Sequence, residues 1–233
     1  VQEDLLEAIR PEHDFFMICN PNNPIGNVIE HEFMQRIIMR CNECHVFLCI
    51  DECFKDFVES SDQLPLGEYF ILKAFTKMYA MPGLRLGYGL CNQVDVLLKI
   101  QFAAQTWPVS TVAQAAGMAA LALEGFEEKT KEIIAIERKY MEKALGDLGF
   151  EVFLSKTNYI FFRAFRYKNQ EKTVWDTLKE DLLDFGINIR DCSNFRGLNK
   201  GYYRIGLRRS EENQELIKKI FFLKKSVDFF KKL

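Results

Sequence analysis

Short apolar runs alternate with helical patterns over the first part of the chain. Four almost continuously apolar runs occur, at Phe15–Cys19, Val46–Ile50, Phe70–Phe75 and Leu86–Leu90. Such runs are typical of strands that are covered on both faces of a sheet. Between the first two runs, Phe33, Ile37 and Ile38 recur at the spacing of one helix face. Strands separated by helices predict an α/β fold with a mostly parallel central sheet flanked by helices.

The pattern changes after Asp95. Helical spacing predicts helices over residues 95–104, 111–124 and 127–148, the last of them ended by Gly149. Short alternating stretches then predict strands at 152–154, 158–163, 187–190 and 202–207, around a helix at 171–185, and a charged amphipathic helix ends the chain. We therefore expect a large domain over residues 1–125, and a long linking helix with a small C-terminal α+β domain over residues 126–233.

Composition narrows the class of protein. The chain is 48% hydrophobic and 27% charged, and its net charge of −2 gives no electrostatic footprint for nucleic acid. No stretch reaches the length of a membrane span, and Val1–Phe16 carries too many charges for a signal peptide. The cysteines lack a disulfide framework, which predicts free thiols and a cytoplasmic location. Because the sequence does not begin with Met, we expect a fragment or a processed chain.

One cysteine pattern matches the spacing of haem attachment. Cys41-Asn-Glu-Cys44-His45 has the form C-x-x-C-H. It lies at the end of a predicted helix, however, and leads directly into the apolar strand at residues 46–50. No second pair of ligands follows, so we favour buried structural thiols and expect no metal site.

Polar groups lie next to each predicted strand of the large domain. An amide-rich turn at Asn20–Gly26, the pair Asp51-Glu52 and the pair Thr76-Lys77 follow three strands, and Pro82–Arg85 precedes the fourth. Ligands of open α/β sheets gather at the carboxyl ends of strands, so one rim would hold an amide, a carboxylate, an amine and a guanidinium. Each alone has an ordinary explanation, as a turn, a cap or a surface lysine. Their combination favours a binding site.

This set of groups suits pyridoxal phosphate. The cofactor needs a lysine amine to which it bonds, a carboxylate that keeps its pyridine nitrogen protonated, donors for its ring hydroxyl and cations for its phosphate. A carboxylate at a strand end stays ionised beside a pyridinium, because the opposite charge offsets desolvation. A lysine beside another cation and partly removed from water loses its proton readily and serves as nucleophile and base.

The motifs resemble those of a known superfamily. Asn22–Gly26 resembles the N-P-x-G turn of the fold-type I pyridoxal-phosphate enzymes, the class I and II aminotransferase superfamily. Ile50-Asp51-Glu52 is similar to the strand of their cofactor aspartate, and Phe75-Thr76-Lys77 with Gly83–Gly87 is similar to their lysine segment. Tyr203–Gly206 resembles the segment whose arginine binds the substrate carboxylate. The resemblance spans essentially the whole chain.

The resemblance implies a role for each cofactor residue. Lys77 would carry the cofactor and move the proton, Asp51 would pair with the pyridine nitrogen, and Asn23 would donate to the ring hydroxyl. The cofactor phosphate would be held by Thr76 and Arg85. Phe54 stands where aminotransferases usually have a tyrosine that donates to the ring hydroxyl, and Ala74 stands where they have a serine or threonine for the phosphate.

The substrate residues follow from the same resemblance. Arg204 would bind the α-carboxylate. Arg190 and Arg208 are candidates for a second anionic group, a phosphate, although surface ion pairs explain each of them equally well. Asn158 is either a substrate-facing residue or a structural hydrogen-bond group.

Within the superfamily, two groups resemble the chain most. The segments 51–57, 76–88, 187–198 and 201–208 resemble the threonine-phosphate decarboxylases of cobalamin synthesis, and the histidinol-phosphate aminotransferases come next. The resemblance implies a decarboxylase of a phosphorylated amino acid, with an aminotransferase as the alternative and a catalytically idle fragment as a third reading. The family's N-terminal part is absent from this sequence, and a homodimer is expected of the full-length protein.

Overall fold

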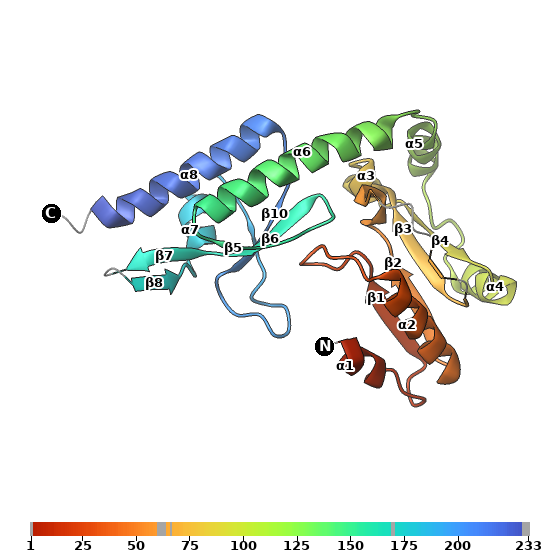
Figure 1. Cartoon of the computed structure of the whole chain (residues 1–233). Helices are drawn as coiled ribbons and strands as arrows, with labels where there is room; N and C mark the ends of the chain where they lie inside the picture. Colours follow the sequence, from red (N-terminus) through yellow and green to blue (C-terminus); the bar gives the residue numbers. More distant parts are fainter. Residues whose placement is uncertain (1, 60–63, 66, 169–170, 230–233) are drawn as a thin grey trace. The chain divides into compact units, whose positions relative to one another are not determined.

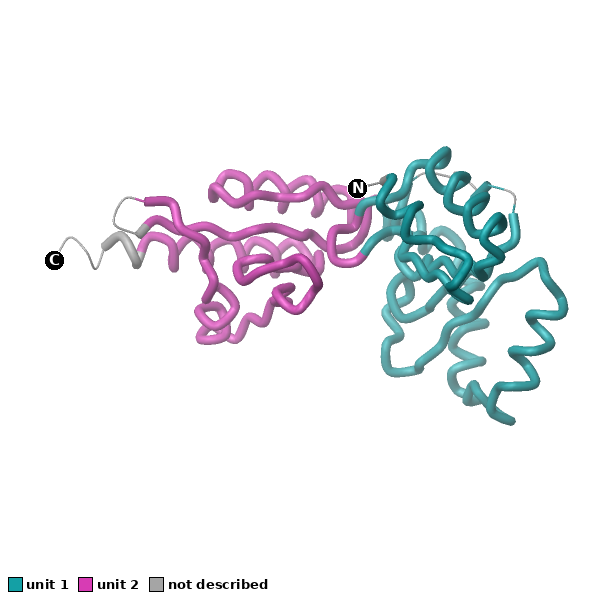
Figure 2. Tube along the Cα trace, turned by 90° about the horizontal axis from the view of Figure 1, so that it is seen from below, with its two compact units in different colours: residues 1–22, 27–131 teal, residues 23–26, 132–233 magenta. Residues whose placement is uncertain are grey.

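Two compact units make up the chain, each coloured separately in Figure 2. The structure is a computed structural model and describes residues 2–59, 64–65, 67–168 and 171–229. Unit 1 comprises residues 1–22 and 27–131, and unit 2 comprises residues 23–26 and 132–233. Helix α6 (Phe126–Asp147) contributes residues to both units. The sequence-based boundary between residues 125 and 126 stays a prediction.

A four-stranded sheet forms the centre of unit 1 (Figure 1). Its order is β1-β2-β3-β4, with strands Phe15–Cys19, Phe47–Asp51, Phe70–Ala74 and Gly87–Cys91. The pairs β1·β2 and β2·β3 are parallel, and β4 runs antiparallel to β3. Each strand lies within one residue of its predicted bounds, and the expectation of a mostly parallel sheet is confirmed.

The helices of unit 1 are α1 (Gln2–Glu7), α2 (His31–Glu43), α3 (Phe75–Met78), α4 (Val94–Ala103) and α5 (Thr111–Leu121), with 3-10 turns η1 (Lys55–Phe57) and η2 (Pro82–Leu84). Three of them, α2, α4 and α5, lie close to predicted helices, whereas α1 and α3 were not predicted. Helix α2 packs its apolar side, including Phe33 and Ile37, against Leu48 and Ile50 of β2. Burial of each such side chain contributes about 1.5–3 kcal/mol. This packing holds the carboxyl end of β2 in place.

The cysteines of the haem-like pattern belong to this core. Cys41 and Cys44 are buried, and the thiol of Cys44 donates to the carbonyl oxygen of Ile9 at 3.6 Å. Burial raises the pKa of Cys41 to about 11, with the neighbouring Cys44 as a smaller cause. All cysteines of the chain are free thiols. The interpretation of Cys41 and Cys44 as structural thiols agrees with these positions.

Unit 2 is built on an antiparallel sheet of order β5-β6-β10-β9. Its strands are Glu151–Phe153, Tyr159–Arg163, Tyr202–Gly206 and Arg190–Asp191, in that order, and β7 (Phe165–Lys168) pairs with β8 (Glu171–Val174) as a separate hairpin. Two helices complete it, α7 (Leu178–Leu183) and α8 (Ser210–Phe229). Within the described ranges, no helix combines the length and apolarity needed to span a bilayer.

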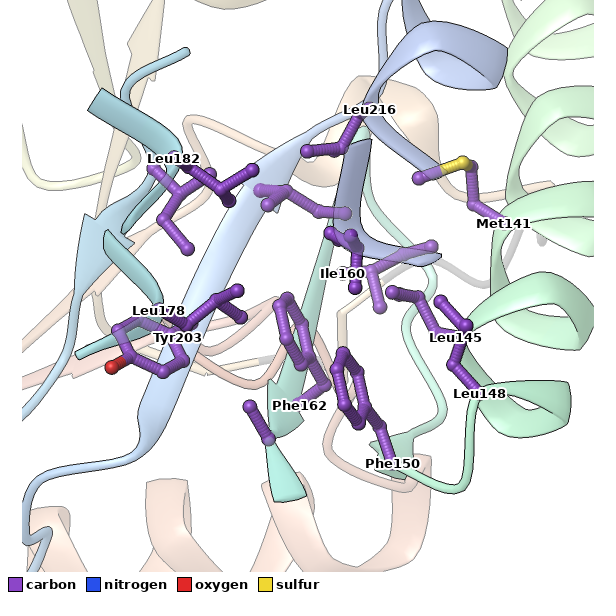
Figure 3. Close-up of a cluster of buried hydrophobic side chains, with 14 of the residues drawn as sticks. Met141, Leu145, Leu148, Phe150, Ile160, Phe162, Leu178, Leu182, Tyr203 and Leu216 are labelled. Atoms are coloured by element: carbon purple, nitrogen blue, oxygen red, sulfur yellow. The ribbon is translucent and has the colours of Figure 1, made fainter. Parts of the chain in front are cut away.

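The core of unit 2 lies on one face of this sheet (Figure 3). Met141 and Leu145 of α6 pack with Ile160 and Phe162 of β6 and with Leu182 of α7. Because side chains alternate between the faces of a strand, the intervening positions of β6 and β10 point to the opposite face. That opposite face carries Arg204 of β10 and its register partner Arg190 of β9.

One predicted helix of unit 2 was wrong. The sequence pattern predicted a helix over residues 171–185, but residues 171–174 form β8 and only Leu178–Leu183 is helical. Trp175 explains the difference, because its side chain is fully buried and its backbone N–H donates to the carbonyl of Ala164. This anchors the segment beside β7, where Thr173 and Val174 suit a strand.

Candidate functional site

The candidate residues are divided between the two units, and each unit positions its own set. Unit 1 carries Asp51, Phe54, Thr76, Lys77 and Arg85. Unit 2 carries the remaining ones, which are Asn23, Asn158, Arg190, Arg204 and Arg208. The two sets are described in turn.

Asp51 lies at the carboxyl edge of the sheet of unit 1. It is the last residue of β2 and pairs in register with Cys19 of β1 and Leu72 of β3. One carboxylate oxygen accepts the backbone N–H of Cys53 at 2.9 Å, and the other accepts the thiol of Cys19 at 3.9 Å. Among the described residues Asp51 has no ion-pair partner. Its carboxylate is therefore oriented by neutral donors and is available to a cation.

Lys77 comes from the short helix that follows β3. Its ammonium lies 5.4 Å from the centre of the Phe54 ring, over the ring face, and its side chain makes no ion pair with a described residue. Phe54 belongs to the loop that follows Asp51, so the loop after β2 and the helix after β3 meet at this contact. A cation over an aromatic face is a favourable arrangement worth about 0.5–1 kcal/mol at exposed sites.

The thiol of Cys53 lies within electrostatic range of both Asp51 and Lys77. Burial, followed by the hydrogen bond and the charge of Asp51, raises the pKa of Cys53 to about 12, and the charge of Lys77 opposes this shift. A carboxylate and an ammonium of opposite charge thus border one neutral thiol. Neither charge is neutralised by another described side chain.

Thr76 and Arg85 complete the predicted set of unit 1. Thr76 precedes Lys77 in α3 and is half-buried, and Ala74 before the helix provides no side-chain cap. Arg85 adopts a left-handed backbone conformation at φ 53° and is exposed, and its Nη1 donates to the carbonyl oxygen of Pro82 at 3.0 Å. A role of these two residues at a phosphate stays a prediction.

Sequence reasoning missed a buried group of charges next to these residues. Lys73 of β3 donates to Asp56 at 2.5 Å and lies 3.7 Å from the carboxylate of Glu52. The signal was present, since Lys73 interrupts the otherwise apolar run Phe70–Phe75. A lysine in a covered strand requires a carboxylate partner, because an unpaired buried charge is very costly.

In unit 2, the loop of residues 23–26 packs against the segment before β6. The backbone N–H of Lys156 donates to the carbonyl of Gly26 at 2.8 Å. Gly26 has φ +87°, and a Cβ added there would lie 2.2 Å from the Oγ of Ser155 and 3.0 Å from the Oγ1 of Thr157. Only glycine fits this position, which explains the glycine of the N-P-x-G turn.

Asn23 at the start of this loop contacts Arg204. The Nη1 of Arg204 donates to the Oδ1 of Asn23, and the guanidinium carbon lies 4.9 Å from the centre of the Tyr159 ring. The Nδ2 of Asn23 has no partner among the described residues. The structure therefore brings together two residues that the sequence predicted as cofactor and substrate contacts, and it leaves a donor on Asn23 unused.

Two arginines lie opposite each other on the outer face of the unit 2 sheet. Arg204 of β10 is the register partner of Arg190 of β9, so both side chains point to the same face. The Nη2 of Arg190 donates to the amide oxygen of Asn194 at 2.9 Å. Neither arginine has a carboxylate partner among the described residues. Like charges at opposed positions are destabilising, so an anion bound between the two guanidiniums would relieve their repulsion.

The other two candidates of unit 2 differ from each other. The Oδ1 of Asn158 is buried and has no hydrogen-bond partner among the described residues, whereas its backbone carbonyl accepts the N–H of Leu207. Arg208 is exposed, and its Nε and Nη2 both donate to the Oε1 of Glu212, at 3.1 and 3.0 Å. Asn158 is therefore open to a further donor, while Arg208 already has an anion.

A protein-family comparison gives a clear match. The family model described as aminotransferase class I and II matches residues 2–220. Threonine-phosphate decarboxylase of Salmonella typhimurium is 32% identical over 91% of this chain and 58% of its own length. Histidinol-phosphate aminotransferase of Methanosphaera stadtmanae is 30% identical over 92% of this chain and 58% of its own length. The chain thus spans less than two thirds of these curated relatives.

Solved structures agree with this match. The histidinol-phosphate aminotransferase from Clostridium acetobutylicum superposes with a TM-score of 0.87 at 29% identity, covering 97% of this chain and 68% of that chain. The L-threonine-O-3-phosphate decarboxylase from Porphyromonas gingivalis gives a TM-score of 0.75 at 26% identity, covering 90% of this chain and 64% of that chain.

Proposed function

Because the chain belongs to the aminotransferase class I and II family, we propose that it is part of a pyridoxal-phosphate enzyme that decarboxylates a phosphorylated amino acid. The observation that carries the proposal is the arrangement in unit 1. The Asp51 carboxylate accepts the backbone N–H of Cys53, the Lys77 ammonium lies 5.4 Å from the ring centre of the adjacent Phe54, and neither charge has an ion-pair partner among the described residues. A cofactor with a cationic ring nitrogen and a carbonyl group suits both residues. The ring nitrogen would pair with the Asp51 carboxylate, and the carbonyl group would react with the amine of Lys77.

The residues present fit this cofactor. When bound, pyridoxal phosphate supplies an electron sink for the pair of electrons that the breaking bond leaves on the substrate. Lys77 would bond to it and return a proton to the substrate carbon, and Asp51 would stabilise the positive charge of the ring nitrogen. Asn23, with its unused Nδ2, would donate to the ring hydroxyl. Thr76 and Arg85 would hold the phosphate group.

The arginines of unit 2 support a substrate with two anionic groups. Arg204 would bind the α-carboxylate and Arg190 would bind the phosphate, because their opposed guanidiniums have only neutral oxygens as partners. Asn158 would accept a donor of the substrate with its open Oδ1. Arg208 is the weaker candidate for binding the substrate phosphate, since its charge is already neutralised by Glu212.

An aminotransferase of the histidinol-phosphate type is the second candidate. The TM-score of 0.87 to such an enzyme favours it. Phe54 favours the decarboxylase, as far as the resemblance goes, because it cannot donate to the ring hydroxyl as the tyrosine of aminotransferases does. The location in the cytoplasm and the homodimeric state of the full-length protein stay predictions.

Incubation with O-phosphothreonine separates the candidates. Release of carbon dioxide with pyridoxal phosphate alone supports the decarboxylase, and turnover that requires a keto acid supports the aminotransferase. Lys77→Arg should abolish either activity, whereas Lys99→Arg is the matched control, since Lys99 is exposed and pairs with Asp95 on its own helix. Absence of both activities with the wild-type chain would contradict the proposal for this chain and favour an idle fragment.

A further inference from the structure

A buried ion-pair cluster connects the two segments that carry the cofactor candidates of unit 1. The cluster consists of Glu52, Asp56 and Lys73, whose side chains are 8%, 22% and 14% exposed. Lys73 donates to Asp56 at 2.5 Å and lies 3.7 Å from Glu52. None of these residues has a part in the chemistry proposed above. Their positions in the chain, close to Phe54 and Lys77, indicate a structural role beside the site.

The two carboxylates flank Phe54 in the sequence. Glu52 lies two residues before Phe54, in the loop after Asp51, and Asp56 lies two residues after Phe54, within the turn η1. The backbone N–H of Glu52 donates to the carbonyl of Leu72 at 2.9 Å, so this loop is also attached to β3 by its backbone. The cluster therefore holds both sides of Phe54 against one strand.

Lys73 lies on the strand that leads to Lys77. Three residues separate the two lysines, and α3 begins directly after β3 at Phe75. The ion pairs of Lys73 thus join the loop that carries Phe54 to the strand and helix that carry Lys77. Both segments meet again where the Lys77 ammonium faces the Phe54 ring at 5.4 Å. A buried pair of this kind fixes geometry, because removal of one partner leaves a charge without compensation.

The cluster also differs from an ordinary surface ion pair. The exposed pair of Lys143 with Asp147, for comparison, has side chains 76% and 65% exposed and lies within one helix. Surface pairs contribute little and position little. Lys73 instead joins residues that are distant in the sequence, at a point where water is largely excluded.

We propose that Lys73 is a positioning residue, which acts through Glu52 and Asp56 to hold Phe54 against the ammonium of Lys77. This inference rests on the proposed function only in so far as Lys77 is the cofactor amine. The contact itself exists without cofactor. It can therefore be tested on the cofactor-free chain.

The test is a double-variant cycle read by chemical labelling of Lys77. An amine-acylating reagent is applied to the full chain at fixed pH, and the labelling rate of Lys77 is divided by that of the exposed Lys99 in the same sample. The ring face stabilises the ammonium form, so loss of the contact should raise this ratio about threefold. Lys73→Met should therefore speed the labelling of Lys77.

The direction of the change in the Lys77 labelling rate distinguishes a positioning role of Lys73 from the effect of its charge alone. Loss of the positive charge of Lys73 alone would stabilise a nearby ammonium and slow the labelling of Lys77. In the background of Phe54→Leu, which removes the ring, Lys73→Met should no longer speed labelling, because coupled residues are not additive. An equal effect of Lys73→Met in both backgrounds, or slower labelling in the wild-type background, would overturn the proposal.

Two further variants control for loss of stability. Lys73→Arg keeps the charge and should retain the wild-type ratio. Ile37→Val weakens the core of unit 1 away from the loop and should leave the ratio unchanged although it lowers the melting temperature. If Lys73→Met fails to fold, Asp56→Asn enters the same cycle with Phe54→Leu, and additivity would again refute the role. Binding of pyridoxal phosphate is measured in a separate experiment. If the proposed function fails, the labelling result on the cofactor-free chain therefore still stands.

Discussion

Replacement of Gly26 by alanine should destabilise unit 2 strongly. The residue has φ +87°, a left-handed conformation that costs an L-residue about 1–2 kcal/mol. The new Cβ would also lie 2.2 Å from the Oγ of Ser155, and overpacking of a filled site adds about 1–3 kcal/mol. Ser155 and Thr157 are both buried, so neither can move into solvent. The expected loss in the free energy of unfolding is about 2–5 kcal/mol, the sum of both ranges.

Tryptophan fluorescence during denaturant unfolding measures this loss. Trp175 is fully buried in the core of unit 2, whereas Trp107 is 88% exposed, so the change in emission reports mainly unit 2. Gly186→Ala is the matched control, because Gly186 also belongs to unit 2 and has φ +73° with no atom within 4 Å of the added Cβ. Gly26→Ala combined with Ser155→Ala should recover part of the loss. The reasoning would be refuted if Gly26→Ala and Gly186→Ala destabilised the chain equally.

Three further predictions follow from other contacts. Asp51→Asn should speed alkylation of Cys53, because Asp51 helps to raise the pKa of this thiol to about 12 and its loss increases the thiolate fraction. Peptide mass spectrometry at a pH below that pKa measures the alkylation rate, and an unchanged rate would contradict the arrangement. Asn213→Leu should cost about 2–3 kcal/mol in urea unfolding, since it removes the buried donor to Glu137 at 2.7 Å, and the added Glu137→Leu change should recover stability. Arg190→Met should raise the KM for a phosphorylated substrate about tenfold with a smaller change in kcat, whereas an equal KM would exclude Arg190 from the site.

Much of the fold could be predicted because the strands of unit 1 are nearly continuous apolar runs, a signal that needs no knowledge of their partners. Their burial could not be predicted from this signal, since β2 is largely buried whereas Phe15 and Met17 of β1 are 53% and 49% exposed. The segment at 171–185 could not be read in the same way. Its local pattern fits a helix, and the contact that decides otherwise is the distant one between Trp175 and Ala164.

The candidate site shows the same division between local and distant information. Asp51 and Lys77 follow their strands directly, so strand ends alone point to them. The partner of Asn23 depends on a contact that no local pattern records, because Arg204 is distant from it in the sequence. The partner of Arg208 is local, since Glu212 lies four residues further along the chain, and this pair agrees with the surface-ion-pair alternative. Lys73 was overlooked because it lies within a strand and not at its end.

The most direct test of the account is the site at which pyridoxal phosphate becomes fixed to the chain. The wild-type chain is incubated with the cofactor, reduced with borohydride and mapped by peptide mass spectrometry. We predict one modified lysine, Lys77, and weaker capture in Asp51→Asn, which loses the carboxylate for the ring nitrogen. Modification spread over exposed lysines such as Lys99, or equal capture by Asp51→Asn, would contradict the account.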